Sequence, residues 1–309
     1  MAPSAKVRRR RVDGVLLLDK PIGVTSNAAL QRVKRLYRAE KAGHTGTLDP
    51  LASGLLPVCL GEATKFAHML LDADKSYLAT VRLGVTTSTA DAEGEVLREQ
   101  PVEVSRGDIE ALLPRFLGNI TQRPPRHAAL KYQGRNYYEY ARAGIEIPRA
   151  ERRVVVSDLA LERWSPPDFA LRVRCGKGTY IRVLAEDIGE ALGCGAHLAA
   201  LRRTATGGFD LHAAATLEAL AMLSEEERDL RLLAIDALVA VLPRIDLAPD
   251  EAARLRLGQA IARAGLPDGA YRAYGADVFV GVAHSHCGGL QPRRLVAAPA
   301  RPSIESLES

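Results

Sequence analysis

The densest group of residues able to do chemistry lies in one short loop. Residues 43–54 read Gly-His-Thr-Gly-Thr-Leu-Asp-Pro-Leu-Ala-Ser-Gly, and the glycines let the backbone turn sharply and approach a ligand closely. Asp49 precedes Pro50, and proline disfavours the α region for the residue before it. This carboxylate is therefore held on a stiff segment and is a candidate catalytic group. The alternative is a structural turn in which Asp49 caps a backbone amide.

The sequence contains none of the common cofactor motifs. There is no GxxxxGK[ST], no dinucleotide fingerprint, no HExxH and no GxSxG. The four cysteines stand far apart, at Cys59, Cys175, Cys194 and Cys287. The one Cys/His cluster, residues 284–287, lacks a second ligand pair at zinc-site spacing. We therefore expect free thiols in a reducing compartment, no metal and no nucleotide or redox cofactor, so that any catalysis uses side chains alone.

Length and composition indicate an ordinary soluble protein. The chain has 309 residues, 47% hydrophobic and 26% charged, which is enough for a sizeable core and excludes a disordered or fibrous chain. No apolar run approaches the roughly 20 residues that span a bilayer, since the best, residues 232–242, is interrupted by Asp236. No apolar region follows the basic first twelve residues, so they are not a secretory signal. We expect a cytoplasmic protein without a membrane segment.

Positive charge is concentrated in two segments. Residues 1–12 hold five basic residues and no acidic one, and residues 121–153 hold eight basic and three acidic residues, against a net charge of +5 for the whole chain. The second segment also holds four of the nine tyrosines. Basic groups interleaved with aromatic rings bind phosphates and stack on bases. The alternative is a solvated helix face whose tyrosines pack inward.

The hydrophobic pattern predicts a mixed arrangement of strands and helices. Strands are expected at residues 14–18, 56–60, 75–83, 154–161, 169–175, 278–282 and 294–296. Helices are expected at residues 27–38 with Ser26 as N-cap, 62–71, 108–116 and 180–192, with a leucine-rich helical region at 213–242 and a short helix from Pro249. Because strands and helices do not alternate regularly, we expect an α+β core rather than a doubly wound sheet.

The texture of the sequence predicts four regions. Residues 1–12 form a basic arm that we expect to be disordered, and residues 13–245 form the main domain. A small β-rich module follows at residues 246–301, after a change in texture near Pro243, and residues 302–309 form a tail.

Eight short motifs follow one another along the chain. They are residues 14–21 (GVLLLDKP), 43–54, 61–65 (GEATK), 74–77 (DKSY), 130–134 (LKYQG), 177–182 (KGTYIR), 193–198 (GCGAHL) and 201–203 (LRR). Together they resemble the signature of the bacterial tRNA pseudouridine-55 synthases, the TruB family. The similarity is nearly continuous from residue 14 to 210 and then thins, with residues 292–296 (PRRLV) similar near the end.

The resemblance implies both a fold and an activity. The implied fold is a mixed, mainly antiparallel sheet flanked by helices, with a small C-terminal PUA-like domain that binds RNA. The implied activity is the isomerisation of uridine 55 in the T-arm of tRNA to pseudouridine, without a cofactor. The implied partner is tRNA, with no obligate protein partner.

The resemblance also implies catalytic roles for three residues. Asp49 matches the nucleophile, and the sequence leaves open whether it adds to ribose C1′ or assists an elimination. Because burial alone favours the neutral acid, a positive charge must keep it ionised in a water-free pocket, and Arg182 matches the arginine that pairs with it. Tyr77 matches the tyrosine that stacks on the target base and takes part in proton transfer. Without the family context, Arg182 would be an exposed helix residue and Tyr77 a core residue.

Further positions match the family's RNA contacts. Tyr180 and Leu201 match residues that line the uracil pocket, although both would otherwise be assigned to the core. His44 matches a histidine that enters the RNA when the target nucleotide is flipped out; otherwise it is a loop histidine bonded to a carbonyl. Lys20 and Lys131 are expected to orient loops or touch phosphate. In the basic segment, the RNA-backbone contacts are expected at Arg123, Arg126, Arg135 and Arg142.

The sequence departs from the family pattern at one loop, and two other functions are compatible with it. Residues 127–128 are His-Ala, where the family usually has an aromatic residue and a serine, so a hydroxyl contact at this loop is not expected. The first alternative is a pseudouridine synthase acting on a different RNA, and the second is a non-catalytic RNA-binding or tRNA-folding protein on the same scaffold. Intact Asp49, Tyr77 and Arg182 disfavour the second.

Overall fold

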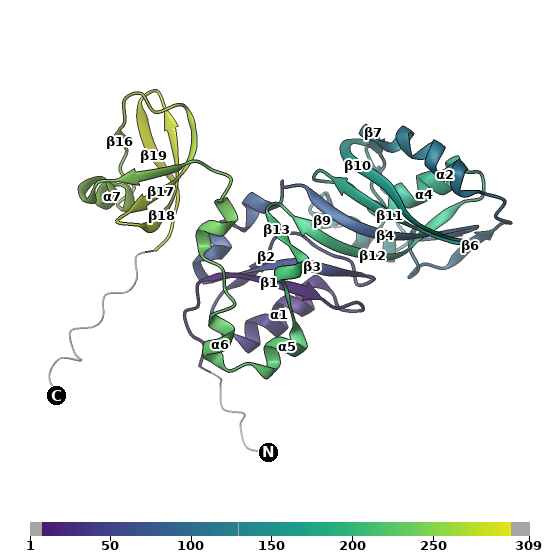
Figure 1. The fold of residues 1–309 in the computed structure, drawn as a ribbon, viewed down its shortest axis with the longest axis horizontal. Helices are drawn as coiled ribbons and strands as arrows, with labels where there is room; N and C mark the ends of the chain where they lie inside the picture. Colours follow the sequence, from purple (N-terminus) through teal and green to yellow (C-terminus); the bar gives the residue numbers. More distant parts are fainter. Residues whose placement is uncertain (1–7, 129, 298–309) are drawn as a thin grey trace, which may run out of the picture.

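One large mixed sheet carries the main domain of the computed structural model, which describes residues 8–128 and 130–297. Eight strands lie in the order β14-β1-β3-β12-β4-β11-β10-β7, while β2 pairs with β3 and β13 with β12 (Figure 1). The strands are β1 (Gly14–Lys20), β2 (Ala42–His44), β3 (Ala52–Leu60), β4 (Lys75–Leu83), β7 (Gly118–Gln122), β10 (Arg152–Ser165), β11 (Asp168–Cys175), β12 (Ala196–Thr206), β13 (Phe209–Asp210) and β14 (Ala215–Thr216). Neighbours are antiparallel except β1 with β14 and β3 with β12.

Strand alternation distributes the core over both faces of the sheet. Leu16 and Leu18 of β1 pack with α1 (Ser26–Leu36) and α5 (Leu217–Met222). Val15 and Leu17 point the other way, into a second cluster. A third cluster joins β4 and β11 to α2 (Arg106–Leu112) and α4 (Ile181–Ala191) at the other end of the sheet (Figure 1). The helices thus cover the sheet at two separate places.

Strand β3 begins earlier than the predicted strand at 56–60, because Ala52–Gly54 pairs with Leu201–Arg203 of β12. At Gly54 the backbone φ is +99°, and a Cβ there would lie only 2.3 Å from the Arg203 carbonyl oxygen. Only glycine permits this approach. The predicted strand at 75–83 is found with the same bounds in β4.

One predicted helix is wrong in type, and a second predicted helical region is interrupted. Residues 62–71 form two 3₁₀ turns, Gly61–Lys65 and Ala67–Leu70, instead of a helix. The leucine-rich region 213–242 is broken into α5, α6 (Glu225–Asp229) and the 3₁₀ turn Ile235–Val239. Ser224 caps α6 in a reciprocal capping box with Glu227, so a new helix starts where a continuous one was expected.

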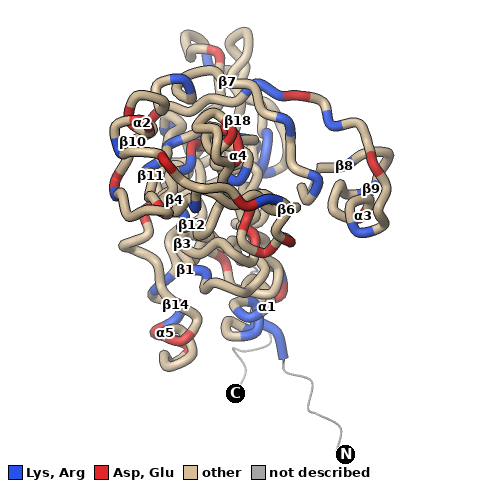
Figure 2. Tube along the Cα trace, turned by 90° about the vertical axis from the view of Figure 1, so that its right-hand side faces the viewer, with Lys and Arg blue, Asp and Glu red and all other residues tan. Residues whose placement is uncertain are grey.

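Two hairpins project from the edges of the main sheet. Strands β5 (Val85–Thr87) and β6 (Val96–Glu99) form one. Strands β8 (Lys131–Tyr132) and β9 (Arg135–Asn136) form the other, followed by α3 (Tyr137–Arg142). The trace of β8, β9 and α3 stands out to one side of the molecule (Figure 2). This projection carries all four tyrosines of the predicted basic and aromatic segment and three of its eight basic residues.

The C-terminal module is a five-stranded sheet in the order β15-β17-β18-β19-β16. It comprises β15 (Arg244–Leu247), α7 (Pro249–Arg256), β16 (Ile261–Ala262), β17 (Gly269–Gly275), β18 (Val278–His286) and β19 (Gly289–Leu295). The sheet starts at Arg244, two residues before the expected boundary at 246. The α+β fold with a mixed main sheet and a small C-terminal β-rich module is confirmed.

The prediction that residues 1–12 form a disordered arm is wrong at the C-terminal side of this segment, around Arg10. Arg10 forms a parallel bridge with Ala39, and its guanidinium binds both carboxylate oxygens of Asp229 at 2.6 Å. This contact spans 219 positions of sequence, which no local pattern reveals. Residues 1–7 and the tail at 302–309 lie outside the described residues. Among the described residues, no helix is both long and apolar enough to cross a membrane.

Candidate active site

The loop that carries Asp49 runs between β2 and β3 and is anchored on both sides. The Ser26 hydroxyl, at the start of α1, both donates to the Leu48 carbonyl at 2.9 Å and accepts from the Leu48 amide at 2.8 Å. The Gly23 amide donates to the Pro50 carbonyl at 2.8 Å. These bonds tie the backbone on either side of Asp49 to the first residue of α1 and to the segment that precedes it, so the carboxylate has a fixed place.

Arg182 lies opposite Asp49 in the first turn of α4. Its Nη2 atom is 3.1 Å from Asp49 Oδ2 and 3.0 Å from the carbonyl oxygen of His127. Its Nη1 atom is 3.3 Å from the Thr89 carbonyl oxygen and 3.4 Å from Asp91 Oδ2. The arginine side chain is only 6% exposed. A buried cation requires this many acceptors, because each one replaces lost hydration.

Asp91 is the more buried of the two carboxylates that face Arg182, with 4% of its side chain exposed. Its Oδ1 atom accepts hydrogen bonds from the Thr89 hydroxyl at 2.5 Å and the Glu93 amide at 3.0 Å. This leaves Oδ2 for Arg182. Asp91 therefore fixes the guanidinium from behind, while Asp49 meets it from the pocket side.

A pocket of about 240 Å³ opens beside the Asp49–Arg182 pair. Its lining consists of Thr47, Leu48, Asp49, Tyr77, His127, Ala128, Gly178, Thr179, Tyr180, Ile181, Arg182 and Leu201. Five of the site residues expected from sequence thus share one cavity: Asp49, Tyr77, Tyr180, Arg182 and Leu201. His44, Lys20 and Lys131 do not line it. The pocket joins a carboxylate, two phenol rings and apolar walls, which suits a flat heterocycle with polar edges.

The pocket is more open than expected. The Asp49 side chain is 43% exposed, so the expectation of a water-free site is not met in the protein alone. Solvent therefore reaches the Asp49 carboxylate from the open side of the pocket.

Tyr77 lines the pocket, and Arg203 lies opposite it on the neighbouring strand β12. Burial raises the pKa of the Tyr77 phenol, and the nearby Arg203 guanidinium opposes the rise. Arg203 is 1% exposed and donates to the carbonyls of Leu55 at 2.7 Å and Gly46 at 3.1 Å. It thereby ties the catalytic loop to β3 and supplies a positive charge beneath Tyr77.

Lys20 lies at the end of β1, just outside the pocket lining. It is fully buried and donates to the carbonyls of Pro21 at 2.9 Å and Val24 at 2.5 Å. Burial lowers the pKa of its amine to about 8, although the negative charges of Asp49 and Glu93 oppose the shift. Lys20 therefore shapes the loop that supports Pro50 and places positive charge near Asp49.

The chain matches known proteins along almost its whole length. Residues 34–181 match the model for the N-terminal domain of TruB family pseudouridylate synthases, and residues 182–245 and 243–296 match two TruB C-terminal domain models. The tRNA pseudouridine synthase B of Thiobacillus denitrificans is 56% identical over 94% of this chain and 98% of that protein. That of Azoarcus sp. is 56% identical over 94% and 97%.

The chain belongs to the TruB family of pseudouridine synthases.

Solved structures of related pseudouridine synthases agree with this family fold. A Cbf5–Nop10–Gar1 complex is similar with a TM-score of 0.69 and 29% identity, covering 88% of this chain and 78% of that one. An H/ACA RNP bound to a substrate RNA containing 2′-deoxyuridine gives a TM-score of 0.71 and 26% identity, covering 92% and 85%. The expected pseudouridine synthase fold is confirmed.

His44 and His127 differ in position within this TruB family protein. His44 ends β2 and is half-buried, outside the pocket lining, while His127 lines the pocket. Burial lowers the pKa of both imidazoles, and Arg203 adds to the effect at His44 and Arg182 at His127. Both are therefore neutral near pH 7.

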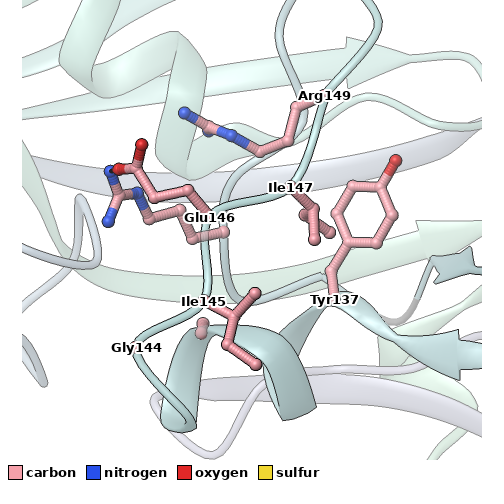
Figure 3. Close-up of a pocket in the computed structure, with 8 residues that line it drawn as sticks. Tyr137, Gly144, Ile145, Glu146, Ile147 and Arg149 are labelled. Carbon is pink, nitrogen blue, oxygen red and sulfur yellow. Dashed lines mark hydrogen bonds and ion pairs between the residues drawn. The ribbon is translucent and has the colours of Figure 1, made fainter.

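The basic residues expected to contact RNA lie on or near the projecting hairpin. Arg123 pairs with Glu151 at 3.3 Å, Arg126 pairs with Glu146, and the Arg142 guanidinium lies 5.5 Å from the centre of the Tyr138 ring. Arg135 and Lys131 are exposed on β9 and β8. Behind them, Tyr137, Ile147 and Arg149 line a small pocket of about 90 Å³ (Figure 3). Acidic partners therefore offset part of this segment's charge.

Two groups at the site were missed by sequence reasoning. Asp91 belongs to a stretch that reads as an ordinary polar turn, and its type gave no signal there. Arg203 lies in the LRR motif, two residues after Leu201, and strand alternation places both on the same side of β12. That spacing could have identified it. Among the described residues, no group of three or more His, Cys, Asp or Glu side chains is placed to hold a metal ion.

Proposed function

We propose that this protein is a tRNA pseudouridine synthase that isomerises uridine 55 in the T-arm, with Asp49 as the nucleophile. The observation that carries the proposal is the ion pair between Asp49 and buried Arg182 at a pocket lined by Tyr77, Tyr180 and Leu201. The family and the shared name of relatives 53–56% identical over nearly the whole chain support the tRNA substrate.

The chemistry conserves every atom of the uridine. The bond between N1 and ribose C1′ breaks, the uracil turns in place, and C5 bonds to C1′. The C5 proton leaves, and N1 carries a proton in the product. Asp49 acts on the sugar, either by adding to C1′ or by assisting an elimination. No oxidant, reductant or water is consumed, so acid–base and nucleophilic side chains suffice.

The other residues have supporting roles in this proposal. Arg182 keeps Asp49 ionised and oriented. The Tyr77 ring stacks on the base, and its protonated phenol is placed to exchange a proton with a turning uracil. Tyr180 and Leu201 hold the base against the pocket wall during the turn, so that it does not diffuse away.

The target base must leave its stack to reach this pocket. Flipping a nucleotide costs a few kcal/mol, and filling the vacated space lowers that cost. His44 is neutral and sits upstream of Asp49 on the same loop, which suits insertion into RNA. The exposed arginines near the hairpin, Arg135 and Arg142 among them, would bind the backbone and bring RNA over the open mouth.

The test compares wild type with Asp49→Asn on an unmodified tRNA transcript. Wild type should form one pseudouridine per tRNA at position 55, and the variant should form it at least about 10³-fold more slowly, as expected for loss of a nucleophile. Binding of tRNA by the variant should stay within about threefold. Sequencing after carbodiimide treatment locates the product. A wild type that binds tRNA but makes no pseudouridine identifies the protein as a binder instead.

A further inference from the structure

A second basic surface lies away from the active-site pocket, at the C-terminal end of α1. A groove of about 830 Å³ is lined by Arg8, Arg9, Gln31, Lys34, Arg35, Arg38 and Ala39. None of these seven residues is acidic, and five carry a positive charge. Figure 2 shows basic residues gathered where the N-terminal segment meets α1. The pocket beside Asp49 shares none of these residues.

The groove has a built geometry with two walls. One wall is the outer face of α1, and the other is the N-terminal segment, held by Arg10. The Arg10 amide donates to the Arg38 carbonyl at 2.8 Å, and the Glu40 amide donates to the Arg10 carbonyl at 3.2 Å. The Arg10 side chain also binds the Tyr37 carbonyl at 3.1 Å and Asp229 at 2.6 Å. Arg8 and Arg9 directly precede Arg10 in the chain, so this anchor also places them.

Four of the five cations of the groove have no ion-pair partner among the described residues. Of its five basic side chains, Arg38 pairs with Glu225 at 2.5 Å. Within the described residues, Arg8, Arg9, Lys34 and Arg35 form no ion pair. A helix dipole favours Lys34 and Arg35 in the last turn of α1, but it does not account for Arg8 and Arg9 beside them. Like charges gathered without partners are relieved by a polyanion.

We propose that this groove binds the phosphodiester backbone of the tRNA substrate, as a contact separate from the one that holds the target uridine. The inference rests on the proposed function. Ser26, at the other end of α1, bonds the catalytic loop at Leu48, and Lys34 lies eight residues further on, about 12 Å along the helix. An RNA seated on Asp49 therefore has backbone within reach. A groove of about 830 Å³ with five cations in its lining suits a continuous chain of phosphates better than one isolated anion.

The experiment uses two variants, one for each wall, and a matched control. Arg8→Gln/Arg9→Gln removes two charges from the arm, and Lys34→Gln/Arg35→Gln removes two from the helix. Arg115→Gln/Arg163→Gln removes two exposed charges elsewhere in the main domain. For each full-length protein, the Kd for a tRNA transcript is measured from 50 to 300 mM salt, together with the pseudouridine formation rate at saturating tRNA. Thermal melts verify folding.

Each groove variant should bind tRNA about tenfold more weakly at low salt, and the slope of log K against log salt should fall by about 1.5, since two phosphate contacts are lost. The rate at saturating tRNA should be unchanged, and the control pair should behave like wild type. Folded groove variants that bind with the wild-type Kd and salt slope would overturn the proposal, while wild-type pseudouridine formation leaves the proposed function intact. Absence of pseudouridine in wild type would instead defeat the proposed function.

Discussion

At the scale of single residues, the site depends on how one guanidinium is held. Arg182 meets three acceptors from two segments besides that of Asp49: Thr89 and Asp91 from the β5–β6 hairpin and His127 from the segment before β8. Three of its four contacts are thus fixed by the protein whether or not RNA is bound. Asp49 meets the guanidinium from the pocket side with a partly exposed carboxylate, so the position of the arginine is set before the substrate arrives.

The first prediction concerns Asp91. Asp91→Asn keeps the shape of the side chain but removes its negative charge, so Arg182 should shift toward Asp49. Misplacement of a catalytic group by about 1 Å costs roughly 10²-fold in rate, and we expect that loss in kcat with little change in tRNA Kd. Single-turnover kinetics at saturating tRNA measure it. Asp168→Asn, which breaks the exposed pair with Arg82, is the matched control and should retain wild-type kcat. An equal loss of binding and turnover at Asp91 would contradict its positioning role.

The second prediction concerns the pH dependence of stability. The pKa of Lys20 is about 8 in the folded protein, against an ordinary value of 10.5. Between these values the unfolded chain binds a proton that the native state does not, so the contribution of Lys20 to stability should rise as pH increases from 8 to 10.5. Below pH 8 both states are charged, and the contribution stays constant at its least favourable level.

Urea unfolding of wild type and Lys20→Met at several pH values tests this. The free energy of unfolding of wild type, minus that of the variant, should increase across this window. Lys131→Met, on the exposed hairpin, should give a flat difference. A flat difference for Lys20 as well would show that its amine is not desolvated.

At the scale of elements, the start of α4 is held by a side chain from another strand. Tyr180 precedes the helix as its N-cap residue but makes no side-chain cap. Instead, buried Gln122 at the end of β7 accepts from the Tyr180 amide at 3.0 Å and donates to its carbonyl at 3.2 Å. Gln122 thus holds both backbone groups of the residue that precedes the helix and fixes the start of the first turn, which carries Arg182.

The third prediction follows from that contact. Gln122→Ala leaves the Tyr180 amide without its partner, and an unsatisfied buried donor costs about 1–3 kcal/mol. We expect that loss in the free energy of unfolding, with a reduced kcat, because the turn carrying Arg182 loosens. Chemical denaturation and single-turnover rates measure the two effects. Gln291→Ala, at an exposed position of β19, should change neither. Wild-type stability in Gln122→Ala would contradict the proposed role of Gln122 in holding the start of α4.

Much of this architecture can be predicted from sequence, because the alternation of β4 and the apolar faces of α1 and α4 are local signals. The candidate site was found through motifs, and the structure brings Asp49 and Arg182 together from positions far apart in the chain. Asp91 could not be predicted, because an aspartate in a polar turn has many structural uses. The 3₁₀ turns at 61–70 were missed because their apolar spacing is compatible with a helix. The ordering of Arg10 depends on Asp229, a tertiary contact without a local signature.

At the scale of the whole molecule, the C-terminal module is docked on the main domain through a shared apolar cluster. Phe279 of β18 lies 5.5 Å from Phe66, measured between ring centres, and the Tyr274 hydroxyl donates to Asp236 at 2.5 Å. Lys65 also binds the Leu295 carbonyl at 3.0 Å. These contacts hold the module against the main domain.

The fourth prediction concerns this docking. Phe279→Ala removes a half-buried ring between the two units and should cost about 2 kcal/mol, less than the loss for a fully buried phenylalanine. Calorimetry should show one unfolding transition for wild type and a separate, earlier transition of the C-terminal module in the variant. Val278→Ala, which alters a neighbouring side chain that is 57% exposed, should melt like wild type. One transition at the wild-type midpoint in Phe279→Ala would mean that the ring does not couple the units.

The exposed flank of Asp49 has a consequence for selectivity. The protein surrounds the pocket on all but one side, and the bound nucleic acid covers the open side. A free nucleoside could enter the pocket but is too small to cover its open side. Its sugar would therefore face bulk water beside a hydrated carboxylate. Discrimination against free nucleosides then requires no separate structural element, because only a folded polymer is large enough to close the pocket from solvent.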